Sequence, residues 1–187
     1  MKKRNWYGAL TLSSLLCMGD LYALQVTQLH SDYHQGEYRL TMTARLAAPL
    51  ARVQAVLRDY AHYPELDTRI LQAEILKGGA NNQLELLTRI KVCFAFLCRT
   101  LQRVEHVSEH DNGLSAEVVP ERSDAEQGST RTELLAQGAQ TQVYYTTSMT
   151  PKFWVPPWVG RTWMLRSMEQ ATVNLFTRIE QRAAAAP

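Results

Sequence analysis

The sequence predicts an α+β domain in which a curved antiparallel sheet of seven strands wraps around one long C-terminal helix. Turn signals separate a run of alternating segments over residues 70–150, which is typical of an antiparallel meander. A long amphipathic segment then closes the chain, and it is the only element long enough to cover one face of such a sheet. The 187 residues, 45% of them hydrophobic, suffice for one domain with a substantial core.

The first long strand is marked by strict alternation of apolar and polar side chains. Its apolar face comprises Tyr38, Leu40, Met42, Ala44 and Leu46. The preceding residues 24–37 look like a partner strand that ends in a turn at Gly36, but the count of seven begins with the alternating strand.

From Pro49 onward the spacing of apolar residues becomes helical. The residues that recur at this spacing are Leu50, Val53, Val56, Leu57 and Tyr60. Proline suits a helix start, because its missing N–H would have no helical partner there. Pro64 then interrupts the pattern, so we expect one or two short helices before the sheet resumes.

Six further strands are predicted over residues 70–78, 83–93, 98–109, 113–121, 129–137 and 141–150, with turn signals between them at residues 78–79, 111–113, 128 and 138. The terminal helix is expected from Val159 to about Ala184. Its apolar stripe comprises Leu165, Met168, Thr172, Leu175 and Ile179. Charged side chains, including Glu180, are expected away from the centre of that stripe.

Residues 1–23 have the features of a cleaved signal peptide in front of a single domain, residues 24–187. Three basic residues precede an apolar run that ends at the small residue Ala23. An uncleaved anchor is the alternative, although the run is shorter than the ~20 residues that a spanning helix needs. We therefore predict a periplasmic or secreted protein.

Net charge gives no indication of a nucleic-acid partner. Cleavage would lower Lys+Arg from 20 to 17 and Asp+Glu from 18 to 17, since residues 1–23 hold three basic residues and Asp20. A neutral domain lacks the basic excess that attracts nucleic acids or anionic membranes.

Export would leave two cysteines, Cys93 and Cys98, in an oxidising compartment. If residues 94–97 form a four-residue hairpin loop, the two side chains face each other at its base, within reach of a disulfide. In one continuous strand they would point to opposite faces instead. We favour the hairpin with the disulfide, and either arrangement is structural.

Two stretches make the chain resemble a known superfamily: VLRDYAHYPEL at residues 56–66, and VVPERSD at residues 118–124 followed by Gly128. The resemblance is to the START-like (SRPBCC, helix-grip) superfamily, closest to its coenzyme-Q-binding and polyketide cyclase-like lipid-transport group. It implies an apolar cavity between the sheet and the C-terminal helix that holds a lipid, quinone or sterol-like molecule. It matches Tyr60, Tyr63, Pro64 and Leu66 to the cavity mouth, and Val119, Pro120, Ser123 and Asp124 to the mid-sheet signature.

Layout and resemblance together predict non-enzymatic binding or transport of a hydrophobic small molecule, with no cofactor, metal or nucleic acid. Ligand-facing side chains are predicted at Leu40, Met42, Tyr63, Leu86, Ile90, Val118, Val143, Tyr145, Met168, Leu175 and Ile179. These face assignments depend on strand register, because a shift of one residue inverts them.

An enzyme of cyclase or hydrolase type is the alternative, because an apolar cavity would raise the pKa of a carboxylate and suit it to acid-base chemistry. The candidate residues are Asp59, Glu121 and Asp124. Each also has a structural interpretation: Asp59 closes a helix end, Asp124 organises a loop, and Glu121 pairs with Arg122 or Arg131.

Residues 149–168 (MTPKFWVPPWVGRTWMLRSM) contain four large aromatic side chains around three prolines, which exclude regular helix or sheet. We interpret Trp163 as a packing residue of the helix. Phe153, Trp154 and Trp158 are predicted to form a hydrophobic gate to the cavity or a lip that contacts a membrane, because a proline-bound loop offers little surface to bury them. A third class of function, an interaction module, would dock this loop on a partner protein.

Overall fold

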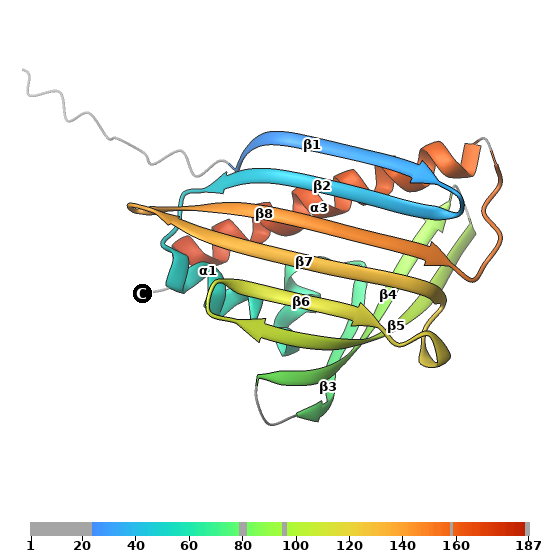
Figure 1. Cartoon of the computed structure of the whole chain (residues 1–187), viewed down its shortest axis with the longest axis horizontal. Coiled ribbons are helices and arrows are strands. Elements are labelled where there is room, and N and C mark those ends of the chain that lie inside the picture. The colour runs from blue at the N-terminus through green and yellow to red at the C-terminus, as the bar shows by residue number, and fades with distance from the viewer. Residues whose placement is uncertain (1–23, 79–81, 95–96, 158, 186–187) are drawn as a thin grey trace, which may run out of the picture.

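The computed structural model of the protein describes residues 24–78, 82–94, 97–157 and 159–185 (Figure 1). These residues form eight strands: β1 (Gln25–His34), β2 (Glu37–Leu46), β3 (Ile70–Gly78), β4 (Gln83–Phe94), β5 (Leu97–His110), β6 (Gly113–Val118), β7 (Ala125–Gln137) and β8 (Gln140–Pro151). The helices are α1 (Leu50–Leu57), α2 (Tyr63–Leu66) and α3 (Val159–Ala185), with short 3-10 turns η1 (Tyr60–His62) and η2 (Pro120–Arg122). The α+β class with a long C-terminal helix is confirmed, and the predicted signal peptide lies outside the described residues.

The sheet has eight strands rather than the predicted seven, in the order β1-β2-β8-β7-β6-β5-β4-β3. The additional strand is β1, which pairs with β2 through a tight turn whose residues Gln35 and Gly36 have φ angles of 49° and 95°. Most side chains of β1 are exposed, as is common on an edge strand. The partner strand and turn predicted over residues 24–37 are therefore confirmed, and only the count of seven strands is wrong.

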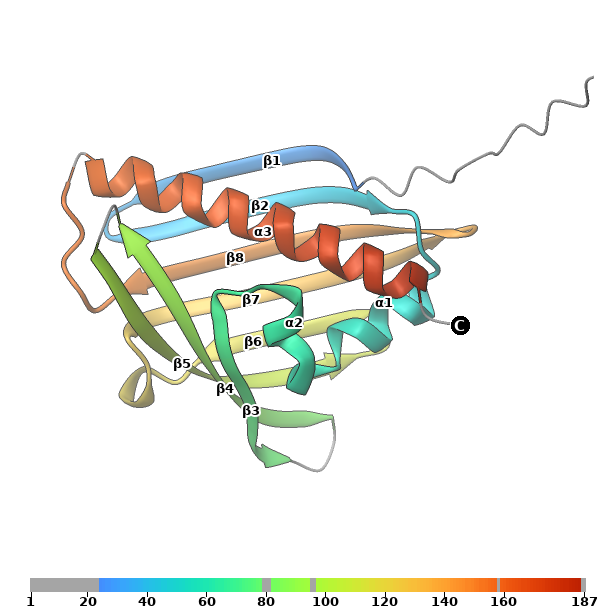
Figure 2. The same cartoon turned by 180° about the vertical axis from the view of Figure 1, so that it is seen from behind.

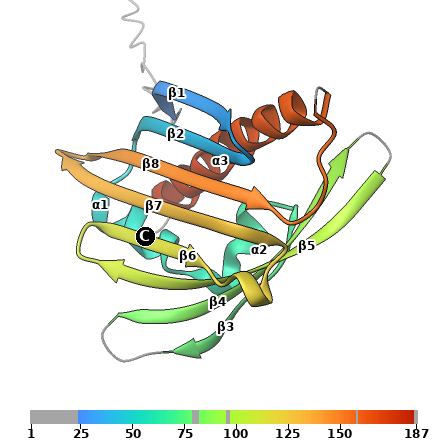
Figure 3. The ribbon, with the colours of Figure 1, turned by 45° about the vertical axis from the view of Figure 1, so that its right-hand side comes forward.

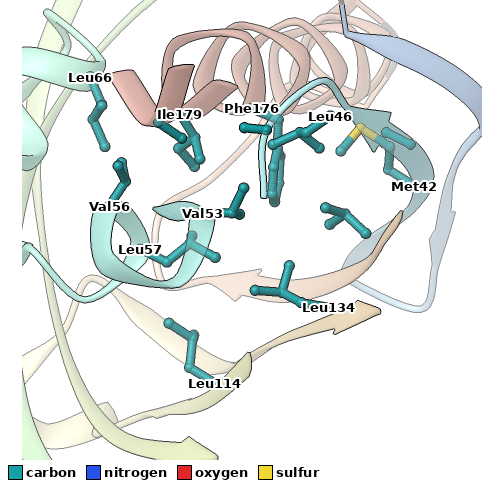
Figure 4. Close-up of a cluster of buried hydrophobic side chains, with 14 of the residues drawn as sticks. Met42, Leu46, Val53, Val56, Leu57, Leu66, Leu114, Leu134, Phe176 and Ile179 are labelled. Atoms are coloured by element: carbon teal, nitrogen blue, oxygen red, sulfur yellow. The ribbon is translucent and has the colours of Figure 1, made fainter. Parts of the chain in front are cut away.

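The sheet curves around α3, and the two short helices α1 and α2 lie on the same concave side (Figures 2 and 3). Every pair of neighbouring strands is antiparallel. Inside this curve, Val53 and Leu57 of α1 point toward Phe176 of α3 and Leu134 of β7 (Figure 4). The concave face therefore carries the core of the domain.

The alternation predicted for β2 is confirmed by its burial. All five apolar side chains, Tyr38, Leu40, Met42, Ala44 and Leu46, are 2% exposed or less. In the register of the sheet they lie opposite Met149, Thr147, Tyr145, Val143 and Thr141 of β8, which fixes the concave face of that strand as well.

The prediction that Glu180 lies away from the buried stripe of the terminal helix is wrong. Glu180 is fully buried, and its Oε1 accepts a hydrogen bond of 2.7 Å from the backbone N–H of Ala47. The buried side of α3 is rotated toward Phe176 and Glu180, while Met168 and Leu175 are only half-buried. The connection from β2 to α1 needs a polar partner at this point, which helical periodicity does not reveal.

Gly128 is part of β7 and not a turn, so this strand begins at Ala125, earlier than predicted. A Cβ atom on Gly128 would lie 2.9 Å from Val118 Cγ2 and 3.0 Å from the carbonyl oxygen of Ser148. The glycine thus marks a close approach of neighbouring strands within the sheet.

The predicted disulfide is confirmed. Cys93 and Cys98 are register partners in the hairpin of β4 and β5, and they form a disulfide. The strands extend one residue further than predicted on each side, so that Phe94 pairs with Leu97 and the loop is shorter than four residues.

Candidate functional site

The concave face of the sheet brings most of the predicted ligand-facing residues together. Leu40, Met42 and Val143 lie next to one another in β2 and β8 and are buried in the core. Leu86 belongs to the same core and comes from β4, near the opposite edge of the sheet, and Ile179 belongs to it from α3. These five side chains fill the space between the sheet and the helix as members of the core cluster.

The remaining predicted residues are less completely covered. Tyr145, Met168 and Leu175 are half-buried and pack against the core cluster. Ile90 and Val118 are also half-buried, although both belong to the concave register through their pairing with Ile70 and Glu105. Apolar side chains that point inward and still keep accessible surface are typical of the wall of a binding site.

Two partly buried tyrosines, Tyr63 and Tyr145, pack against the core cluster. The Tyr63 hydroxyl donates a hydrogen bond of 2.6 Å to the Leu57 carbonyl oxygen, and the ring of Tyr145 packs edge-on against Phe176 at 5.2 Å between centroids. Burial raises the pKa of the Tyr145 phenol. Burial, followed by the negative charge of Glu105, raises the pKa of the Tyr63 phenol. Both phenols therefore remain neutral, and each lies deep in the fold while keeping some accessible surface.

An ion pair that the sequence did not indicate lies on the same face. Arg103 and Glu105 of β5 are 2.7 Å apart between Nη2 and Oε1, and their side chains are only 20% and 10% exposed. Arg103 also donates a hydrogen bond of 3.1 Å to the Thr130 hydroxyl of β7. Neither face of β5 is uniformly apolar, so alternation alone could not assign these charges to the interior.

Asp59, the first of the predicted catalytic carboxylates, belongs to a surface network at the end of α3. Its Oδ1 lies 2.6 Å from His62 Nδ1, and its Oδ2 accepts a hydrogen bond of 2.9 Å from Arg182. Arg182 also contacts Glu65 at 3.2 Å. The network ties the segment after α1 to the C-terminal helix.

Asp124 holds the connection between β6 and β7 against β5. Its Oδ2 accepts a hydrogen bond of 2.8 Å from the Gln102 N–H, and its Oδ1 lies 3.6 Å from Arg99 Nη2. The neighbouring Ser123 hydroxyl bonds both the N–H and the carbonyl oxygen of Val104, at 2.9 and 3.1 Å. These side chains replace strand pairing where β6 has ended.

Glu121 is exposed in η2, and its predicted pairing with a neighbouring arginine is wrong. Arg122 forms an ion pair with Glu85, and Arg131 forms one with Glu133 at 2.7 Å. The three predicted carboxylates thus lie at separate places and do not form one cluster.

Residues 152–157, which connect β8 to α3, lie beside the hairpin of β4 and β5 (Figures 2 and 3). Phe153 is half-buried, with the guanidinium carbon of Arg99 at 5.5 Å from its ring centroid. Trp154 is 78% exposed, the most exposed large apolar side chain among the described residues. Trp158, the third predicted gate residue, lies outside the described residues, and Trp163 is half-buried in α3.

The described part of the chain contains neither a metal-binding cluster nor a membrane-spanning helix. Within residues 24–78, 82–94, 97–157 and 159–185, no three His, Cys, Asp or Glu side chains are grouped so as to hold a metal ion. None of the helices described there is both long and apolar enough to cross a membrane.

No family model and no curated protein sequence matches the chain. Solved structures do match it. An aromatase/cyclase, ZhuI from a Streptomyces species, shares 17% identity at a TM-score of 0.62, over 81% of this chain and 99% of its own. A START superfamily protein from Mycobacterium smegmatis shares 16% identity at a TM-score of 0.61, over 78% of this chain and 97% of its own. A STAR-related lipid transfer protein from Xanthomonas axonopodis shares 12% identity at a TM-score of 0.56, over 80% of this chain and 98% of its own. At such identities the likeness concerns the fold alone.

Proposed function

We propose that this domain, whose fold is START-like as the sequence resemblance predicted, binds a hydrophobic small molecule between the concave face of its sheet and α3. The observation that carries the proposal is the set of inward-facing apolar side chains that keep accessible surface, among them Ile90, Val118 and Leu175. Covering such surface stabilises a complex by ~25 cal/mol per Å², so a lipid-sized ligand needs few polar contacts.

Of the two functions considered, the site supports non-enzymatic binding better than catalysis of a cyclase or hydrolase type. Asp59 and Asp124 are both held in contacts that stabilise the fold, and Glu121 is exposed on η2. A general acid or base must reach the bound substrate, and none of the three predicted carboxylates lies among the apolar side chains of the concave face. Glu105 does lie on that face, but it is held in the ion pair with Arg103. The structural similarity to an aromatase/cyclase does not by itself identify a general acid or base in this chain.

A fluorescence titration with anilinonaphthalene sulfonate, a hydrophobic probe, tests the proposal. Ile90→Trp would fill the space beside Ile90, and we expect it to weaken probe binding by about tenfold or more, since overpacking costs ~1–3 kcal/mol. Leu135→Trp is the control, because Leu135 is 54% exposed on the opposite face of the sheet. Equal affinities of the two variants would contradict a site on the concave face.

The ligand is expected to enter at the end where Phe153 and Trp154 lie, and this end is the part of the molecule best suited to contact a membrane. Trp154 and Val159 are 78% and 66% exposed, and Lys152 and Arg161 flank them with positive charge. Exposed apolar groups bordered by basic side chains suit the interface of a bilayer. Peripheral membrane contact here would shorten the path of a lipid from bilayer to site.

We also propose that the protein is exported to the periplasm or secreted. The disulfide between Cys93 and Cys98 supports this, because such bonds persist mainly in oxidising compartments. Amino-terminal sequencing of the protein from its own cells should begin at residue 24, whereas a chain that retains residues 1–23 would contradict cleavage.

A further inference from the structure

The edge strand β3 presents apolar side chains on a border of the sheet where no further strand follows. It is the last strand in the order of the sheet, and among the described residues its one neighbouring strand is β4 (Figure 1). Leu71 is 51% exposed, Ile75 48% and Leu76 37%. An edge that combines unpaired backbone N–H and C=O groups with exposed apolar surface is a template for pairing with another strand.

A β-bulge at Leu76 brings two charged side chains of β3 onto one face of the sheet. Glu74 is opposite Leu87 of β4 and Lys77 is opposite Glu85, while Leu76 has no register partner. Leu87 and Glu85 are two residues apart and share a face, so Glu74 and Lys77 share it as well. In a regular strand, side chains three residues apart would point to opposite faces.

This arrangement is self-complementary under a two-fold axis. When two β3 strands pair antiparallel about the midpoint between Ile75 and Leu76, Glu74 of each copy lies opposite Lys77 of the other. Two reciprocal ion pairs then form on the same face, and the apolar side chains of both bulges meet between them. A surface that contacts its own copy in this reciprocal way is what a two-fold symmetric dimer requires.

Both charged side chains are accessible to such a partner. Glu74 and Lys77 are exposed. Glu74 accepts one hydrogen bond of 2.8 Å from Gln72, and a carboxylate can accept about four, so it can still pair with a lysine. A Cβ atom on Gly78 would meet no described atom within 4 Å, which leaves room beside the end of the strand.

The charges also restrict which strand can pair with this edge. A lysine and a bulge on an edge strand disfavour most partner strands, but Lys77 is compatible with a strand that places a carboxylate opposite it. We propose that β3 is the contact surface of a two-fold symmetric homodimer, in which two sheets join edge to edge through antiparallel β3 strands. Pairing satisfies backbone groups of both edges and covers the exposed apolar side chains of β3. This dimer is independent of the proposed binding function.

Charge reversal tests the pairing, with analytical ultracentrifugation over a range of concentrations as the measurement. The parent protein should form a dimer. Glu74→Lys places a lysine opposite a lysine at both contacts, so the dissociation constant of the dimer should rise at least about tenfold. Lys77→Glu should have the same effect through two pairs of carboxylates. Both positions are exposed, so the variants should fold as the parent does.

Mixing the two single variants tests the two-fold register itself. In a mixed dimer of Glu74→Lys with Lys77→Glu, opposite charges face each other again at both contacts. We therefore expect the equimolar mixture to form the dimer that neither variant forms alone. The double variant Glu74→Lys with Lys77→Glu should pair with itself as the parent does.

Asp32→Lys is the control, because it makes the same change of charge on β1, the opposite edge of the sheet, where Asp32 is also exposed. This variant should dimerise with the dissociation constant of the parent. A parent protein that stays monomeric at every concentration, or single variants that dimerise as the parent does, would overturn the proposal. A mixture that stays monomeric would overturn the pairing of Glu74 with Lys77.

Discussion

The two halves of α3 pack against the rest of the domain in different ways. In the C-terminal half the helix is tightly buried, with Thr172, Phe176, Ile179, Glu180 and Ala183 all 5% exposed or less. In the N-terminal half the buried residues are Gly160 and Met164. The helix is therefore anchored at its C-terminal end and less completely covered at its N-terminal end.

Polar contacts strengthen the anchored end. Glu180 accepts a hydrogen bond from the Ala47 N–H. The hydroxyl of Thr141 in β8 donates a hydrogen bond of 2.7 Å to the carbonyl oxygen of Ala48, which follows Ala47 in the chain. The connection between β2 and α1 is thus held from the helix and from the sheet at once. Arg182 adds its contacts with Asp59 and Glu65 on the surface.

At its N-terminal end, α3 contacts β1 and the segment that precedes the helix. The Arg161 guanidinium lies 4.1 Å from the ring centroid of Tyr33, and Ser31 donates a hydrogen bond of 2.6 Å to Glu169. Gly160 packs so closely on Pro156 that a Cβ atom there would lie 2.7 Å from the proline ring. These contacts position the start of the helix.

The largest expected difference between the two ends is in their contribution to stability. Phe176→Ala, at the anchored end, should lower the free energy of unfolding by about 3–5 kcal/mol, because it leaves a cavity in a core where Phe176 is 1% exposed. Leu165→Ala, in the N-terminal half of α3, should cost clearly less, because Leu165 is only half-buried. Urea denaturation of both variants measures the difference, and equal losses would break the comparison.

The disulfide should give the next largest effect. Replacing Cys93 and Cys98 by serine opens a loop of sequence separation 5, for which chain entropy predicts a loss of roughly 2 kcal/mol. The same variant should bind anilinonaphthalene sulfonate as the parent does, since neither sulfur is on the concave face. Urea denaturation with and without reductant checks this value. Reductant should lower the free energy of unfolding of the parent protein and should leave that of the serine variant unchanged.

Glu180→Ala should destabilise the anchored end by about 1–2 kcal/mol, because the Ala47 N–H loses its acceptor. Glu180→Gln keeps an acceptor oxygen at the same place, so its free energy of unfolding should stay closer to that of the parent. An equal loss in both variants would show that charge, and not the hydrogen bond, matters at this position.

Trp154→Ser should leave stability within ~0.5 kcal/mol of the parent, because the side chain is 78% exposed. Binding to lipid vesicles in a sedimentation assay should nevertheless decrease. Leu135→Ser removes a comparably exposed apolar side chain from the outer face and serves as the control. Unchanged vesicle binding in Trp154→Ser would contradict membrane contact through Trp154.

Much of the fold could be predicted because the spacing of apolar residues and the residue types in turns reflect local structure. The alternation of β2 and the turn residues between later strands depend only on neighbouring residues, and both appear in the structure. β1 was missed in the count because an exposed edge strand has no apolar face, and Gly128 was misinterpreted because a close strand approach resembles a turn in sequence.

The polar part of the site could not be predicted, because it depends on contacts between distant residues. Arg103 of β5 reaches the Thr130 hydroxyl of β7 only after these strands have assembled. The burial of Glu180 likewise follows from the position of the Ala47 N–H, 133 residues earlier in the chain. A prediction from the apolar stripe of the helix treats glutamate as polar and therefore places it on the exposed side.

Native mass spectrometry of the protein purified from its own cells tests the central claim most directly. The account predicts a bound species that corresponds to one hydrophobic molecule, retained by Leu135→Trp and lost from Ile90→Trp. A protein that carries no such molecule, and acquires none when incubated with lipid extract from those cells, would contradict it.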